Sequence, residues 1–224
     1  MKNRKKRKGK KIYLCLAVVP AIGILLCLGL LYKPGYFTTP TPIEDEQVSE
    51  YLTHELAPNF YNGIQLGEPF DLVVSQEGIN DIIARSKWPR QGKNFTFMTP
   101  KVFFVSERIA IMGAVVVKDA EFIVTIVGNP VFDEQGLLTL KIEQVKVGAL
   151  NVTLLAKLII REIYSNHIKV KEIKPGDIVA NIVMSLLNNK PFEPVLEISD
   201  KKARIENVAI EPRKLTLHLS PIKD

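Results

Sequence analysis

The residues with the widest catalytic range in this chain are its three histidines, His54, His167 and His218. A histidine serves as a general base or a metal ligand only when other polar groups converge on it. No second histidine or cysteine stands at metal-ligand spacing from any of the three, and the sequence contains no G-x-S-x-G, S-x-x-K or phosphate-binding glycine motif. We therefore expect no enzyme, no metal and no cofactor.

Apolar side chains are the other groups that can form a site, because a cavity lined by them can hold a lipid acyl chain. Hydrophobic residues make up 46% of the sequence. Two interpretations stay open: the apolar surplus lines a groove, or it fills a closed core. Under the first, the groove is lined by bulky apolar residues of strands and helices: Phe104, Ile111, Phe122, Val124, Ile126, Leu155, Leu158, Ile159, Ile182 and Leu186.

The N-terminal region is typical of a membrane anchor. Residues 1–11 contain eight Lys or Arg and no acid, which leaves 22 basic and 24 acidic residues in the rest of the chain. Residues 12–32 follow without one charged residue, and about 21 residues of helix span roughly 30 Å, the thickness of a bilayer core. The positive-inside rule places the basic tail in the cytoplasm and the C-terminal side outside it.

A cleaved signal peptide is the alternative for this region, but its apolar segment is usually shorter and ends in small residues. Here the segment ends in Leu30, Leu31 and Tyr32, so we expect an uncleaved, single-pass anchor in the cell membrane. Since the domain beyond it has a net charge near −2, the sequence gives no reason to expect nucleic-acid binding.

Residues 33–46 read as an extended linker, and residues 47–224 as one extracytoplasmic domain. Both cysteines, Cys15 and Cys27, lie in the anchor. The domain therefore has no disulfide, and core burial alone must hold it together.

Hydrophobic periodicity predicts the elements of this domain. A short helix over 47–56, ended by Pro58, precedes a strand over 69–75 and a helix over 76–86 that Ser75 caps. Short turns separate the next strands, which favours an antiparallel meander with a break over 128–136. The expected strands, later helices and closing strand pair are 101–106, 108–117, 121–127 and 137–147, then 151–164 and 177–189, then 202–210 and 215–219.

This order predicts an α+β fold in which a twisted antiparallel sheet wraps around amphipathic helices. The stretch Val74 to Ser86 resembles the strand-to-helix junction of YpmS-like bacterial envelope proteins, which share a basic N-terminus and one N-terminal membrane helix. Residues 129–151 resemble their segment in which a Pro, a Gly turn, an L-x-L strand and a V-G-x-L step precede a helix. A similar organisation occurs in LmeA-type phospholipid-binding proteins and, more remotely, in tubular lipid-binding domains.

The resemblance covers residues 69–221 and implies a sheet wrapped about a long helix, an apolar groove between them and no catalytic residues. Our leading hypothesis is a membrane-anchored domain that binds lipid acyl chains during handling of envelope lipids. The alternative is a scaffold or regulatory module with a closed core and an envelope protein as partner. An envelope hydrolase is the third hypothesis, and it requires a His close to an Asp or Ser in a cleft.

Overall fold

The computed structural model describes residues 18–40, 48–92, 94–156, 185, 190–198 and 201–222. These residues form a mixed α+β structure dominated by antiparallel strands, which confirms the predicted α+β class and the antiparallel pairing. Most of the amphipathic helices around which the sheet was expected to wrap lie outside the described residues. The helical segments are residues 18–30, η1 (Tyr51–Leu56), α2 (Ala57–Leu66) and α3 (Gln76–Ala84). The strands are β1 (Phe70–Ser75), β2 (Arg90–Gln91), β3 (Thr96–Phe97), β4 (Lys101–Val105), β5 (Arg108–Val117), β6 (Ala120–Phe132), β7 (Leu138–Val147), β8 (Leu150–Asn151), β9 (Val195–Ile198), β10 (Lys201–Glu211) and β11 (Lys214–Pro221).

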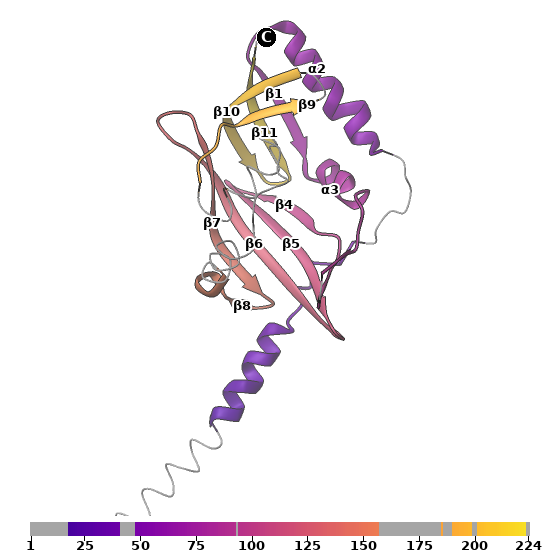
Figure 1. Ribbon diagram of the computed structural model, residues 1–224, viewed down its shortest axis with the longest axis vertical. Helices are drawn as coiled ribbons and strands as arrows, with labels where there is room; N and C mark the ends of the chain where they lie inside the picture. The colour runs from indigo at the N-terminus through magenta and orange to yellow at the C-terminus, as the bar shows by residue number, and fades with distance from the viewer. Residues whose placement is uncertain are drawn as a thin grey trace, which may run out of the picture.

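The strands make two antiparallel sheets. The smaller has the order β1-β11-β10-β9, and the larger has the order β2-β3-β5-β6-β7-β8 with β4 paired to β5. The smaller sheet and α2 lie at one end of the molecule, and the helix of residues 18–30 projects from the other end (Figure 1). The larger sheet therefore lies between that helix and the smaller sheet.

The predicted hairpins of the larger sheet are confirmed, with tight turns at Ser106-Glu107 and Lys118-Asp119. The predicted break after residue 127 is wrong, because β6 continues to Phe132. Pairing of β6 with β5 ends at Gly128, so the rest of β6 pairs with β7 alone. The Leu140 N–H donates to the hydroxyl of Ser185 (2.8 Å) and not to its partner Pro130. No hydrogen bond between this pair of residues is therefore lost by having proline at position 130.

The first helix of the domain was expected to end before Pro58. It instead runs on to Leu66. Residues 51–56 form a π-helical stretch, in which the N–H of Ala57 donates to the carbonyl of Leu52. Pro58, which has no N–H to donate to the preceding turn, therefore lies directly after the π-helical stretch, at the start of α2. Phe60 of this helix is fully buried in a core with Leu72, Ala203, Ile205 and Leu219 of the smaller sheet.

The strand β1 and the helix α3 agree with prediction, and Ser75 caps the helix by accepting a hydrogen bond from the N–H of Gly78 (3.0 Å). Helix α3 also covers the open edge of β4. The Asn80 amide accepts from the N–H of Val102 (2.7 Å) and donates to its carbonyl (2.8 Å). Gln76 accepts from the N–H of Phe104 (2.9 Å). Side-chain amides thus replace a neighbouring strand along this edge.

Replacing Asn80 with Ala removes both hydrogen bonds and leaves the backbone groups of Val102 part-buried without partners. We expect the free energy of unfolding to fall by about 2 kcal/mol. Denaturant unfolding of the full chain in detergent micelles measures the change, with the exposed Asn62→Ala as the matched control. Equal stability of the two variants would contradict the bridging role of Asn80.

A second polar network joins the start of η1 to α3. The buried Ser49 donates its hydroxyl proton to Asp81 Oδ2 (2.5 Å), and Arg85 Nε donates to both Asp81 oxygens (3.0 and 3.2 Å). The hydrogen bond from Ser49, followed by the interaction with Arg85, lowers the pKa of Asp81 below its ordinary value. The carboxylate form of Asp81 therefore stabilises the folded state.

Because the pKa of Asp81 is lowered on folding, its stabilising contribution is complete above the unfolded pKa of about 4 and is lost as the pH falls through the folded pKa. We expect Ser49→Ala to cost about 1–2 kcal/mol at neutral pH. The difference from the parent protein shrinks below about pH 4. Unfolding curves at several pH values test this, with the exposed Ser106→Ala as control; a difference independent of pH would contradict it.

The two sheets meet at their turns. The N–H of Glu107 donates to the carbonyl of Ile210 (3.0 Å), and the N–H of Arg213 donates to the carbonyl of Phe104 (3.1 Å). Phe104, Val74 and Ile210 form a buried cluster beside these bonds. The closing strand pair, predicted over 202–210 and 215–219, is the hairpin of β10 and β11.

Several predicted elements fall partly outside the described residues. In the helix expected over 151–164, residue 151 belongs instead to strand β8, and residues 153–156 form one helical turn. Of the helix expected over 177–189, only Ser185 is described. Of the predicted membrane helix, residues 18–30 are helical, and residues 12–17 lie outside the described part. Within the described residues, no helix is both long and apolar enough to cross a membrane.

Candidate functional site

Strand register divides the side chains of the larger sheet between two faces. Directly paired residues share a face, and successive residues alternate between faces. One face, which we call the linker face, carries the pairs Phe103–Ala110 and Met112–Thr125. The opposite face carries the pair Ile111–Ile126.

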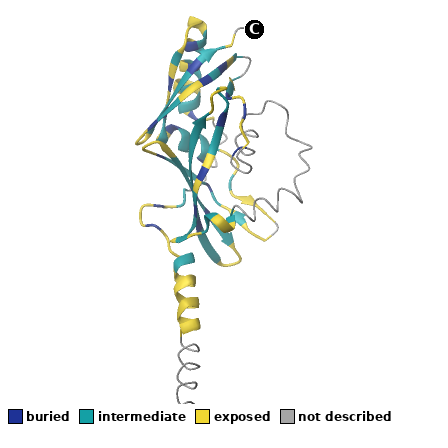
Figure 2. Cartoon of the chain, turned by 90° about the vertical axis from the view of Figure 1, so that its left-hand side faces the viewer, coloured by how far each residue is buried: buried dark blue, intermediate teal, exposed yellow. Residues whose placement is uncertain are grey.

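The linker face takes its name from residues 33–40, part of the predicted linker, which pack against it (Figure 2). Phe37 is only 7% exposed and lies in a cluster with Met112, Ala114 and Ile123. Lys33 donates to a carboxylate oxygen of Glu121 (2.7 Å), and Thr39 donates to the other oxygen (3.4 Å). An aromatic anchor and an ion pair thus hold this segment on the sheet.

The start of the segment is fixed by the turn between β7 and β8. The N–H of Ala149 donates to the carbonyl of Gly29 (2.8 Å), which is one of the last carbonyls of the N-terminal helix. Gly148 has a φ of 58°, and a Cβ there would stand 2.3 Å from the Gly29 carbonyl oxygen. The close approach of helix and turn therefore requires glycine at position 148.

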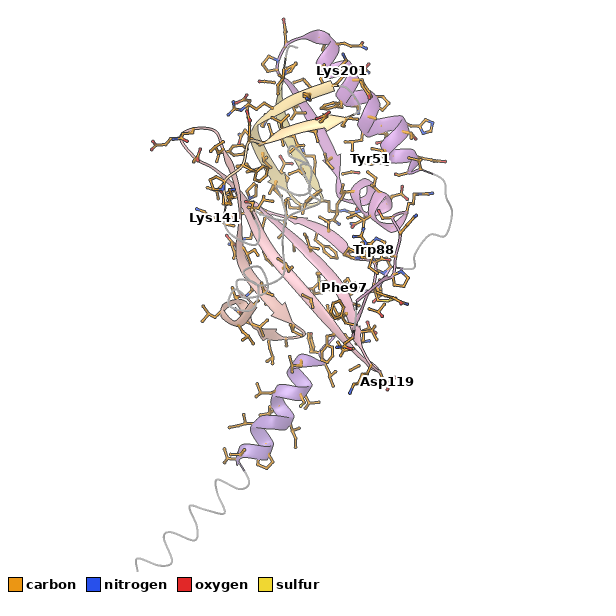
Figure 3. All side chains as sticks on the ribbon, in the orientation of Figure 1. Tyr51, Trp88, Phe97, Asp119, Lys141 and Lys201 are labelled. Carbon is orange, nitrogen blue, oxygen red and sulfur yellow. The ribbon has the colours of Figure 1, made fainter. Side chains whose placement is uncertain are left out.

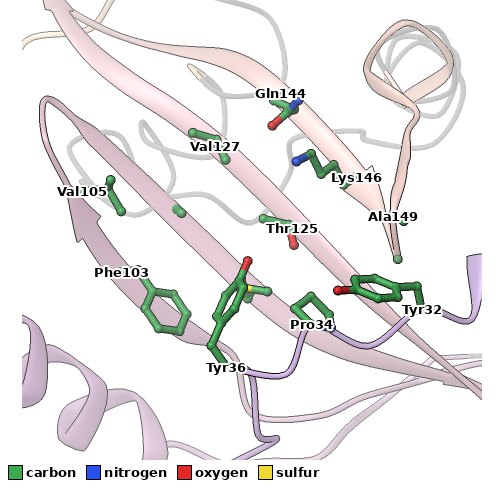
Figure 4. A pocket seen from close by; sticks show the side chains of 13 residues that line it. Tyr32, Pro34, Tyr36, Phe103, Val105, Thr125, Val127, Gln144, Lys146 and Ala149 are labelled. Atoms are coloured by element: carbon green, nitrogen blue, oxygen red, sulfur yellow. The ribbon is translucent and has the colours of Figure 1, made fainter. Parts of the chain in front are cut away.

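A pocket of about 510 Å³ opens on the linker face beside this junction. Such a volume is within the roughly 300–1,000 Å³ of ligand sites. Tyr32, Pro34 and Tyr36 flank it on the linker side, and Gln144 and Lys146 extend from β7 (Figure 4). The other lining residues come from strands β4 to β7 and the following turn: Phe103, Val105, Ala110, Met112, Thr125, Val127, Gly148 and Ala149. We call this pocket the linker-face groove.

The described side chains that line the linker-face groove are mostly apolar. Among the described residues, the lining has one cation, Lys146, and no carboxylate, histidine, cysteine or serine. The arrangement can hold an elongated apolar group over β4 to β6 and a polar group near β7.

The residues predicted to line a groove are divided by the structure. The register places Phe104, Ile111, Phe122, Val124 and Ile126 together on the opposite face, away from the linker-face groove. There Ile111 and Ile126 line a smaller apolar pocket of about 160 Å³. Phe104, 4% exposed, belongs to the buried cluster that joins the two sheets.

Of the five helix residues predicted to line a groove, only Leu155 is among the described residues. Leu155 lies in the helical turn 153–156 with 56% of its surface exposed. The other four residues, Leu158, Ile159, Ile182 and Leu186, lie outside the described residues.

Sequence reasoning missed Tyr32, Tyr36 and Lys146. The available signal was the pair of aromatic residues Tyr36 and Phe37 inside a linker that contains proline and glycine. A solvated spacer is typically polar, so large apolar side chains there indicate packing against the domain. For Lys146, the alternation of Gln144, Lys146 and apolar neighbours indicates one more polar face on this strand. Neither pattern says that the two segments meet.

The two described histidines, His54 and His218, lie outside the two pockets described above. His218 Nδ1 lies 2.5 Å from Asp71 Oδ1 across the β1–β11 pair, with side-chain exposures of 39% and 58%. Neither residue lines either of the two pockets described above. His54 is on the exposed side of η1, and its ring contacts the neighbouring Thr53 hydroxyl (3.0 Å). Among the described residues, no group of His, Cys, Asp and Glu is arranged to hold a metal ion.

No protein-family model matches the chain, and no curated protein matches it. The resemblance to YpmS-like and LmeA-type proteins therefore stays a prediction from the sequence.

Proposed function

We propose that the chain is a single-pass membrane protein whose extracytoplasmic domain holds the acyl chain of one lipid in the linker-face groove. The observation that carries the proposal is the position of the groove, which is mostly apolar and opens where the N-terminal helix joins the domain. A lipid leaving the bilayer beside this helix would meet the groove first. This proposal places the acyl chain on the linker face, whereas the strand residues predicted to line a groove lie on the opposite face.

The anchor is supported by the surface of the N-terminal helix. Its side chains are apolar all round, and large ones are exposed on every side, as with Val19, Ile24, Leu25 and Leu28 at 61–68%. A helix that is apolar on its whole surface is buried in a protein or in lipid. A Cβ at Gly23 would meet no atom within 4 Å, so no part of the domain covers that point of the helix.

Two tyrosines support the placement of the groove at the membrane surface. Tyr32 and Tyr36 follow the helix directly and are 53% and 74% exposed. Tyrosine is enriched where the headgroups meet the hydrocarbon, since its ring is apolar and its hydroxyl is wet. In this orientation the turn at Gly148 and Ala149 also faces the bilayer.

Native mass spectrometry of the full chain, after exchange into a mild detergent, tests the proposal. We expect one lipid to persist on each chain after the exchange and to release fatty-acyl ions on fragmentation. A bare protein mass would contradict lipid binding and would favour the scaffold module with a closed core. The domain need not be cut from its anchor for this measurement.

A further inference from the structure

The linker-face groove has a polar end and an apolar end. Thr125, Gln144 and Lys146 lie toward β7, whereas Phe103 and Val105 of β4 lie at the other side, across β5 and β6 (Figure 4). We infer that the groove selects a lipid with an anionic headgroup, which Lys146 receives while the acyl chain lies over β6, β5 and β4. The inference rests on the proposed function and names the class of its ligand.

Charge is the first argument. Lys146 is the one charged residue in the lining, and it forms no ion pair within the described part of the chain. The two acids within strands β4 to β7 are already paired, Glu121 with Lys33 (2.7 Å) and Glu143 with Arg108 (2.8 Å). Among the described residues the groove thus presents an ammonium group without a counter-ion, which is complementary to an anion.

Position is the second argument. Lys146 pairs with Thr125 of β6, so its side chain rises from the linker face, and its ammonium end points from β7 toward β6 (Figure 4). The amide of Gln144 and the hydroxyls of Thr125 and Tyr32 are further donors in the same lining. A phosphate or carboxylate placed there can accept several hydrogen bonds while its chain remains on apolar side chains.

Desolvation supplies the energetic reason. A lipid chain seated on Phe103, Ala110 and Val127 expels water from the groove and lowers the local dielectric beside Lys146. A neutral headgroup leaves the ammonium poorly solvated, whereas an anionic one compensates for the lost water. The two headgroups therefore differ in affinity even with identical chains.

The test compares two single-chain probes, lysophosphatidic acid and the monoacylglycerol with the same acyl chain, on the full-length protein in neutral detergent micelles. We expect the phosphate-bearing probe to bind about tenfold more tightly than the neutral one. Lys146→Gln should remove this preference, and Lys146→Arg should restore most of it. Lys141→Gln is the matched control, because Lys141 is an exposed lysine on the same strand, nearer the smaller sheet (Figure 3).

Equal binding of both probes to the parent protein would overturn the headgroup inference and leave lipid binding intact. If Lys146→Gln still preferred lysophosphatidic acid over the monoacylglycerol, the inference would also be overturned, since a group other than Lys146 would then bind the phosphate. Displacement of the anionic probe by inorganic phosphate alone would assign the site to free phosphate. Failure of both probes to bind would overturn the proposed function itself, and this inference with it.

Discussion

The Ala110→Trp variant is expected to lose its bound lipid, with affinity for a single-chain probe falling at least a hundredfold. Ala110 lies on the linker face between Phe103 of β4 and Val127 of β6, and all three line the groove. An indole there occupies the space that the proposed chain would fill, and the open groove accepts it without overpacking a closed core. Retained lipid in native mass spectra measures the effect.

The control for this variant is Val117→Trp on the same strand. Val117 is 37% exposed and lies on the opposite face near the end of β5. This change should leave both lipid retention and stability as they are in the parent protein. Equal lipid retention by the two variants would place the lipid elsewhere on the chain.

Phe60→Ala is expected to reduce the free energy of unfolding by about 3–5 kcal/mol. The Phe60 side chain is fully buried between α2 and the smaller sheet, and its ring meets the ring of Phe70 at 6.3 Å in an edge-to-face arrangement. A loss of this size is a large part of the roughly 5–15 kcal/mol that stabilises a domain. Denaturant unfolding in detergent micelles measures it.

Leu66→Ala on the same helix is the matched control, because Leu66 is 75% exposed. Its change should remain within about 0.5 kcal/mol. If Phe60→Ala were as stable as Leu66→Ala, the packing of α2 on the smaller sheet would be contradicted.

Local patterns predict much of this fold. Runs of Val, Ile and Phe separated by short connections predict β4, β5 and most of β6 and β7, because each hairpin is a local structure. The cap at Ser75 also depends only on the next three residues. The continuation of β6 through Pro130 was not predicted. It depends on the end of the β5–β6 pairing at Gly128 and on the hydrogen bond between Leu140 and Ser185.

The groove could not be predicted in the same way. Consecutive apolar residues such as Phe103 and Phe104 give both faces of β4 the same character, so periodicity cannot say which face is closed by the core. The structure buries Phe104 against Val74 and Ile210, and Phe103 lines the groove. Contacts between residues far apart in the sequence decide the outcome.

The ends of the groove depend on such contacts as well. Phe37 packs against Met112 and Ala114, and the Gly29 carbonyl accepts a hydrogen bond from the N–H of Ala149. Both contacts join residues that are far apart in the sequence. Sequence spacing alone predicts a linker over 33–46 and says nothing of where it packs. The glycine at position 148 is visible in the sequence, but its helix partner is not.

Photo-crosslinking at two adjacent residues of β6 tests the central claim most directly. Val127 lines the linker-face groove, and Ile126 lines the smaller pocket on the opposite face. With benzoylphenylalanine at one position or the other in the full chain in its membrane, irradiation should attach a lipid to the protein at position 127 and not at position 126. A lipid adduct at position 126 alone, or at neither position, would contradict a linker-face site for the acyl chain.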